Sequence, residues 1–178
     1  MLDLVCENIR DNLFFYLQHK YVVKPAAMTF RKAQREDVPV IIQMIANDKL
    51  GQHREHFADP LPAYYYDAFE KINAEDRQEL IVAMNDNDEV IGTLQLTFLQ
   101  YLTYKGGLRS QIEAVRVRED MRGEGVGHAL FEWAINRSKE RNVHMIQLTT
   151  DKQRPEALRF YEKLGFKNSH EGLKLRFE

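Results

Sequence analysis

The sequence predicts an α/β (α+β) protein with a mixed, mostly antiparallel, twisted sheet, helices on both faces and an additional N-terminal helix. Before residue 118, apolar runs are separated by polar turns at hairpin spacing, which is typical of antiparallel strands. After that point the pattern changes to strand, helix, strand, helix, which favours a parallel pairing covered by helices. The 178 residues suit one domain with a single core.

The N-terminal segment is expected to lie outside this domain. Residues 2–17 carry apolar side chains at helical spacing, and Pro25 interrupts the chain after them. We expect residues 1–27 to form a helical extension whose apolar stripe packs on the domain or on a second copy, so that a homodimer is possible. Residues 28–178 then form the main domain.

The first half of the main domain should contain two helices and three hairpin strands after an initial strand at 28–33. Residues 36–47 read as a helix because apolar side chains recur at helical spacing and Pro39 suits a first turn. An aromatic-rich segment, 61–74, reads as the second helix. An Asn-Asp-Asn-Asp turn and a Lys-Gly-Gly turn separate the hairpin strands. Those strands are expected at 80–84, 90–102 and 110–118.

The second half should complete the sheet with helices between its strands. A helix is expected at 127–141, followed by an apolar strand at 143–150 and a further helix at 155–164. Phe166 and the alternating segment Leu173–Phe177 are expected to supply the last strand positions.

Composition excludes several classes of function. The formal net charge of −2 gives no basic excess for a nucleic-acid backbone. Cys6 is the only cysteine, which excludes an internal disulfide, and the histidine spacings match no metal motif, so no metal is expected. No apolar run approaches the length of a membrane span, and the N-terminus lacks a basic region typical of a signal peptide. We therefore expect a cytoplasmic protein with no nucleic-acid or membrane partner.

A glycine-rich turn, Arg122-Gly123-Glu124-Gly125-Val126-Gly127, lies between a predicted strand and a predicted helix. Glycines let the backbone approach a ligand closely, and the helix start offers unpaired N–H groups and a partial positive charge. Together these features predict a phosphate or diphosphate site, to which the arginines Arg116, Arg118 and Arg122 could add charge. The alternative is a turn that only caps the helix. The spacing Arg-x-x-Gly-x-Gly does not match a Rossmann fingerprint. A Walker loop would need a Gly-Lys-Ser/Thr ending, and His128 follows Gly127 instead.

Two motifs together resemble the GNAT superfamily of acetyl-CoA-dependent N-acetyltransferases. The stretch from Val115 to Gly127, with its Arg-x-x-Gly-x-Gly turn, is similar to the fourth strand and following helix of that family. The stretch Ala157-Leu158-Arg159-Phe160-Tyr161-Glu162-Lys163-Leu164-Gly165-Phe166 is similar to its second motif. The resemblance implies a sheet whose central strands splay apart around acetyl-CoA. It departs from the family at Arg154, where many members carry an asparagine that orders the cofactor.

The resemblance also implies the residues that bind acetyl-CoA. The backbone of Val115, Arg116 and Val117 would pair with the pantetheine arm as another strand would. The diphosphate would be held by the turn and the first helical residues, namely Arg122, Gly123, Gly125, Val126, Gly127 and His128.

Amine acetylation needs a group that takes a proton from the amine and a group that protonates the departing thiolate. Glu113 is the candidate base, because it lies in a strand similar to the glutamate-bearing strand of glucosamine-6-phosphate acetyltransferases. Alternation would place it on the face of Val115 and Val117 unless a bulge intervenes. Tyr161 is the candidate acid. The alternatives are that Glu113 is a solvated or ion-paired strand residue and that Tyr161 is packed only by its ring.

The acceptor is expected to be the primary amine of a small molecule. Rival hypotheses are a protein N-terminus or lysine, a non-catalytic acyl-CoA-binding module, and an aminoglycoside with an acidic cleft built from Glu55, Asp59, Asp67 and Glu70. Weaker candidates for the acceptor wall are His53, Arg54, Tyr64, Tyr65 and Tyr101.

Overall fold

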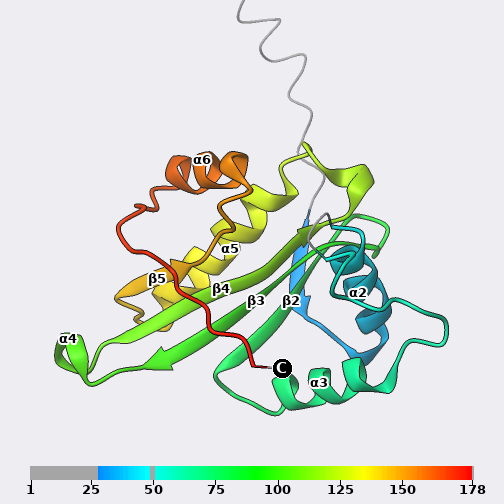
Figure 1. The fold of residues 1–178 in the computed structure, drawn as a ribbon, viewed down its shortest axis with the longest axis horizontal. Coiled ribbons are helices and arrows are strands. Elements are labelled where there is room, and N and C mark those ends of the chain that lie inside the picture. The colour runs from blue at the N-terminus through cyan, green and yellow to red at the C-terminus, as the bar shows by residue number, and fades with distance from the viewer. Residues whose placement is uncertain (1–27, 49–50, 178) are drawn as a thin grey trace, which may run out of the picture.

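The computed structural model describes residues 28–48 and 51–177 (Figure 1). The helical extension expected at 1–27 lies outside the described residues. The strands are β1 (Thr29–Lys32), β2 (Gln78–Met84), β3 (Val90–Gln100), β4 (Leu108–Val117) and β5 (Met145–Leu148). The helices are η1 (Arg35–Asp37), α2 (Val38–Ala46), α3 (Ala63–Asn73), α4 (Thr103–Gly106), η2 (Glu119–Met121), α5 (Val126–Glu140) and α6 (Pro155–Lys163).

The five strands form one sheet in the order β1-β2-β3-β4-β5. Neighbours from β1 to β4 are antiparallel, and β4 pairs with β5 in parallel. The mixed, mostly antiparallel sheet expected from the sequence is therefore confirmed. None of the helices in the described part of the chain is long and apolar enough to cross a membrane.

Helices cover both faces of the sheet (Figure 1). The α5 side holds the larger core, built around Leu94, Leu96 and Ile112 of the sheet and Leu130 and Phe131 of α5. The opposite face is covered by α2 and α3, whose apolar side chains pack on β2 and the start of β3. Because both faces are covered there, residues 90–94 of β3 are all buried.

An ion-pair network ties α5 to the sheet. Glu79 of β2 is only 3% exposed and accepts hydrogen bonds from Arg137 at 2.7 Å and from Arg141 at 3.3 Å. Burial alone would raise the pKa of the Glu79 carboxyl, but the two arginines outweigh it and the pKa is lowered. The network therefore fixes the helix whose first turn carries the glycine motif.

The C-terminal segment differs from the sequence expectation. Phe166 and Leu173–Phe177 were expected to finish the sheet, yet the described chain forms no strand after β5, and Figure 1 shows this segment as coil. Leu173, Leu175 and Phe177 are 94%, 82% and 89% exposed. A two-residue apolar alternation gives a segment the pattern of a strand but does not supply a partner edge, so that prediction was wrong here.

Candidate active site

The sheet opens between β4 and β5. Their parallel ladder runs from the pair Arg109 and Met145 to the pair Ile112 and Leu148, where β5 ends. Strand β4 continues to Val117, so residues 113–117 have β3 on one side and no strand partner on the other within the described chain. An extended edge of this kind can pair with an amide-bearing ligand as it would with a strand. This opening matches the splay implied by the family resemblance.

A β-bulge lies at this opening. Thr93 pairs with Arg116 and Gln95 pairs with Glu113, so two residues of β4 oppose Leu94 alone, and Ala114 has a left-handed φ of 53°. The extra residue changes which side chains share a face.

The bulge places Glu113 and Arg116 together on the face covered by α2 and α3. Val115 and Val117 instead pack against the core on the α5 side. The exception named in the sequence analysis therefore applies: the bulge breaks the alternation, and Glu113 does not share the face of Val115 and Val117. Glu113 remains exposed, and its carboxylate accepts a hydrogen bond of 2.8 Å from Gln111.

The glycine turn, by which we mean residues Arg122 to His128, leads from this strand into α5. Gly123 and Gly125 have φ values of 89° and 82°, in the left-handed region that a side chain disfavours. A Cβ at either position would meet nothing within 4 Å, so open space lies in front of the turn. No side chain caps α5 at Gly125, which leaves the helix start available to an anion.

The start of α5 lies close to the sheet because β3 carries Gly92 beneath it. A Cβ at Gly92 would lie 3.0 Å from atoms of both Val126 and Leu130. Val126 is buried in the same core, whereas Gly127 and His128 continue the first turn, with His128 exposed. Sequence reasoning missed Gly92, since an isolated glycine in a strand signals close backbone approach only in general terms.

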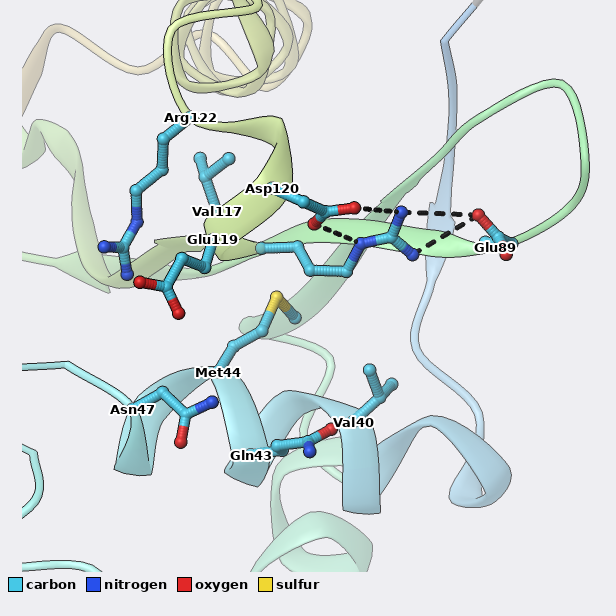
Figure 2. A pocket seen from close by; sticks show the side chains of 10 residues that line it. Val40, Gln43, Met44, Asn47, Glu89, Val117, Glu119, Asp120 and Arg122 are labelled. Carbon is cyan, nitrogen blue, oxygen red and sulfur yellow. Dashed lines mark hydrogen bonds and ion pairs between the residues drawn. The ribbon is translucent and has the colours of Figure 1, made fainter.

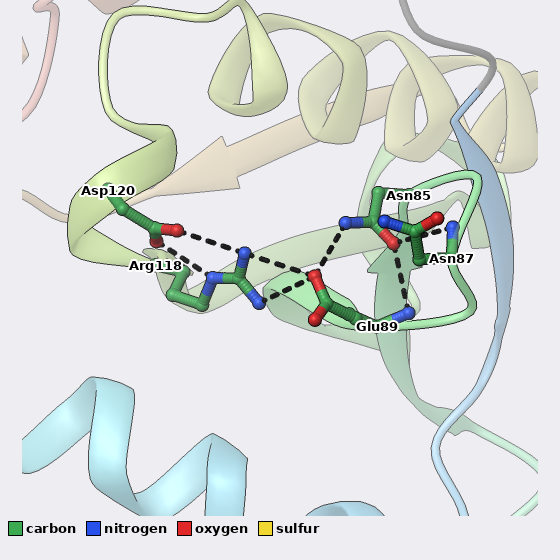
Figure 3. Close-up of polar contacts among 5 residues, drawn as sticks. All are labelled: Asn85, Asn87, Glu89, Arg118 and Asp120. Atoms are coloured by element: carbon green, nitrogen blue, oxygen red, sulfur yellow. Dashed lines mark hydrogen bonds and ion pairs between the residues drawn. The ribbon is translucent and has the colours of Figure 1, made fainter.

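Charges near the turn are distributed differently from the sequence expectation. Arg118 is engaged by the carboxylates of Asp120 at 2.7 Å and Glu89 at 3.3 Å (Figure 3). Arg116 lies on the sheet face covered by α2 and α3, opposite to the α5 face, and pairs with Asp48 at 3.6 Å. Only Arg122 of the three expected arginines therefore extends from the turn itself.

Arg122 also lines a cavity of about 650 Å³ between α2 and the end of β4 (Figure 2). Val117 and Arg118 form its wall on the strand side, while Val40, Gln43, Met44 and Asn47 close it from α2. The glycine turn thus opens beside a hollow large enough for part of a cofactor-sized molecule.

Tyr161 reaches the opening from α6. Its ring packs 5.4 Å from that of Phe131 and 6.2 Å from that of Phe166. Burial raises the pKa of the Tyr161 hydroxyl above its ordinary value, although the nearby charges of Arg154 and Arg116 act against this shift. Tyr161 is therefore packed by its ring and also keeps a proton that it can donate at neutral pH.

Three arginines gather where the strands part, and we call Arg54, Arg116 and Arg154 the arginine cluster. Arg154 precedes α6 and donates a hydrogen bond to Asp48, which also pairs with Arg116. The charge of Arg54 lies near enough to lower the pKa of Arg116. The sequence singled out Arg154 as a departure and Arg54 as a weak candidate, but Asp48 carried no signal, because its role depends on partners 68 and 106 residues away.

Two of the other acceptor-wall candidates contact neighbouring side chains. Tyr101 stacks on Arg109 near the β3–β4 hairpin, and Tyr65 donates its hydroxyl to Glu55. Glu70 pairs with Arg35 at 2.7 Å. Two of the four acidic residues of the hypothetical aminoglycoside cleft, Glu55 and Glu70, are therefore engaged by neighbouring side chains. Among residues 28–48 and 51–177, no group of three or more histidine, cysteine, aspartate or glutamate side chains is arranged to hold a metal ion.

A splayed mixed sheet with a bulged central strand and a glycine turn at a helix start defines an acyltransferase of the GNAT type. The sequence model of the acetyltransferase (GNAT) family matches residues 42–166, and the chain belongs to this family.

The curated sequence relatives align with only part of this chain. The chain is 31% identical over 84 residues to the aminoalkylphosphonate N-acetyltransferase of Salmonella typhimurium, an alignment covering 47% of this chain and 54% of that protein. The chain thus spans about half the length of the curated relatives it matches.

Two solved structures show the fold. One, described as a transcriptional regulator from Bacillus halodurans, has a TM-score of 0.82 and 53% identity, covering 85% of this chain and all of that one (100%). A predicted acetyltransferase with acetyl-CoA from Clostridium acetobutylicum has a TM-score of 0.64 and 24% identity, covering 84% and 96% of the two chains.

Proposed function

We propose that the protein transfers the acetyl group of acetyl-CoA to the primary amine of a small molecule by direct attack of the amine. The observation that carries this proposal is the opening of β4 away from β5 directly before the glycine turn. The unpartnered strand edge suits the amide groups of pantetheine, and the uncapped helix start suits a diphosphate. The name of the Salmonella relative, which describes N-acetylation of a small amine, supports the acceptor class.

In this proposal the cofactor is held chiefly by main-chain groups. The backbone of Val115, Arg116 and Val117 lies along the strand edge, and the glycine turn offers N–H groups with Arg122 as an added charge. The space in front of Gly123 and Gly125, where a Cβ would meet no protein atom, is the space a phosphate group needs. Acetyl-CoA supplies the activated acyl group, and the chain orients it.

Proton transfers are assigned to two side chains. An alkyl amine has a pKa of about 10.4, so it is mostly protonated at neutral pH and must lose a proton before attack. Glu113, exposed beside the bulge, takes that proton directly or through water. The amine nitrogen then forms a bond to the thioester carbon, the carbon–sulfur bond breaks, and Tyr161 donates its proton to the departing thiolate.

A thiol-release assay tests this proposal with acetyl-CoA and a panel of amines, amino acids and short peptides. Release that depends on a small amine and yields its N-acetyl product by mass spectrometry is the expected result. Faster acetylation of peptides would assign the enzyme to protein substrates instead.

A second candidate is a non-catalytic acyl-CoA-binding module. The observation that favours it is the description of the 53% identical structure as a transcriptional regulator. Binding of acetyl-CoA without thiol release for any amine or peptide would select this candidate.

A further inference from the structure

The arginine cluster is assembled from three separate parts of the chain, and two of its members share one carboxylate. Arg116 belongs to β4, Arg154 precedes α6, and Arg54 follows α2. Asp48 accepts a hydrogen bond from Arg154 and lies 3.6 Å from Arg116. Three guanidinium groups therefore share a neighbourhood in which Asp48 is the carboxylate that acts on Arg116.

The central arginine is buried with part of its hydrogen-bonding capacity unused. The Arg116 side chain is 16% exposed, and its Nη1 donates to the Val115 carbonyl at 2.7 Å. Its Nε is buried and has no hydrogen-bond partner in the structure. Burial lowers the pKa of Arg116, and the charges of Arg154 and Arg54 act in the same direction. A half-buried guanidinium with an unused donor favours an anion as a further ligand.

The cluster lies near the proposed proton donor. The charges of Arg154 and Arg116 both act on the Tyr161 hydroxyl, which places them near the proposed proton donor. Glu113, the proposed base, shares a sheet face with Arg116. A group held by the arginines would therefore belong to the acceptor.

We propose that the acceptor amine also carries an oxoanion, either a phosphonate or phosphate group or a carboxylate, and that Arg116 and Arg154 bind it with Arg54 adding charge. This inference rests on the proposed function, since it concerns the acceptor of that reaction. A guanidinium fork binds such groups with two parallel hydrogen bonds, which fixes their orientation as well as their position. The anion would thereby direct the amine toward Glu113.

Binding is measured first, without any reaction. Titration calorimetry of the full chain with methylphosphonate and with acetate, neither of which has an amine, should detect binding of at least one. Arg154→Gln should weaken this binding about tenfold or more. Arg35→Gln is the matched control, because Arg35 also pairs with a carboxylate, Glu70, but on the outer surface of α3. It should leave the binding unchanged.

Turnover then distinguishes the type of anion. The probes are 2-aminoethylphosphonate, β-alanine and the neutral β-alaninamide, which share the same spacing between amine and second group. We expect kcat/KM for at least one anionic amine to exceed that of the amide about tenfold or more, with the larger value identifying phosphonate or carboxylate. Arg154→Gln should abolish this preference through KM, and Arg154→Lys should restore part of it.

Two results would overturn the anion site. The first is no heat from either methylphosphonate or acetate, and the second is an equal loss of kcat/KM for β-alaninamide and for both anionic amines in Arg154→Gln. Failure of the proposed function looks different. If either anion binds in an Arg154-dependent way but no amine is acetylated, the anion site stands and the acetyltransferase assignment fails.

Discussion

The glycine turn and the arginine cluster both lie beside strand β4, but the turn is one continuous segment whereas the cluster is built from separate segments. The turn is seven consecutive residues whose main chain faces open space at a helix start. The cluster is three side chains from separate segments, of which Arg116 and Arg154 are joined through Asp48. In the proposed function, the turn recognises the cofactor through backbone groups and the cluster recognises the acceptor through charge.

The largest effect should follow from a side chain in the glycine turn. Gly125→Val adds a branched side chain at a φ of 82° and fills the space in front of the turn, so acetyl-CoA affinity should fall more than about 1,000-fold, equivalent to about 4 kcal/mol. Titration calorimetry of the variant with acetyl-CoA measures this loss of affinity.

Gly106→Val is the matched control for this prediction. Gly106 has a φ of 75° and equally open surroundings, but it lies in the β3–β4 hairpin. Both variants should lose similar stability, about 1–2 kcal/mol from left-handed strain. Equal loss of acetyl-CoA binding in the two variants would contradict the assignment of the turn.

Removal of the proposed acid should slow turnover without affecting the cofactor. Tyr161→Phe keeps the ring packing against Phe131 and should lower kcat about 100-fold, while the acetyl-CoA Kd changes less than about twofold. Tyr101→Phe, near the hairpin, serves as the control. Unchanged turnover in Tyr161→Phe would remove this residue from the mechanism.

The raised pKa of Tyr161 adds a pH test of the same role. Because its folded-state pKa lies above its ordinary value near 10, the hydroxyl stays protonated across neutral and mildly alkaline pH. Its contribution to stability is present below about pH 10 and is lost as pH rises through the folded pKa. A fall in kcat between pH 7 and 9 that disappears in Tyr161→Phe would contradict this.

Replacement of the proposed base should have an effect that depends on pH. Glu113→Gln should lower kcat/KM about 30-fold at pH 7 but only about threefold near pH 10, because the amine then loses its proton without help. Glu75→Gln, an exposed carboxylate in the loop before β2, is the control. A loss that stays constant across this pH range would indicate a role in binding instead.

The smallest effects concern surface charge near the turn. Arg122→Ala should weaken acetyl-CoA about fivefold at low salt, whereas Arg118→Ala should change it less than about twofold, since Arg118 is already paired with Asp120 and Glu89. Parallel titrations at two salt concentrations measure the difference. A larger effect at Arg118 would reverse the assignment of charges.

The sequence predicted features that depend on neighbouring residues. Helical spacing located α2, α5 and α6, and the glycine spacing located the turn at Gly125. The bulge at Ala114 was not predictable from alternation, because a single inserted residue leaves the apolar pattern nearly unchanged while it turns Glu113 to the other face. The coil at Leu173–Phe177 was missed because pairing depends on a partner edge.

The arginine cluster was even less predictable from the sequence than the bulge or the coil. Arg154 could be noticed as a departure from a family pattern, and Arg54 could be guessed from its position after a helix. The meeting of Arg154 with Arg116 at Asp48 depends on how β4 and β5 diverge, which no local pattern encodes. The proposed acceptor site could therefore be inferred only from the tertiary structure.

The most direct measurement compares acetyl-CoA with S-acetylpantetheine, which lacks the diphosphate and nucleoside, by calorimetry on the full chain. If the glycine turn binds the diphosphate, acetyl-CoA should bind at one site per chain and S-acetylpantetheine should bind at least about 100-fold more weakly. Equal affinities, or no heat from acetyl-CoA with folded protein, would contradict a diphosphate site at this turn.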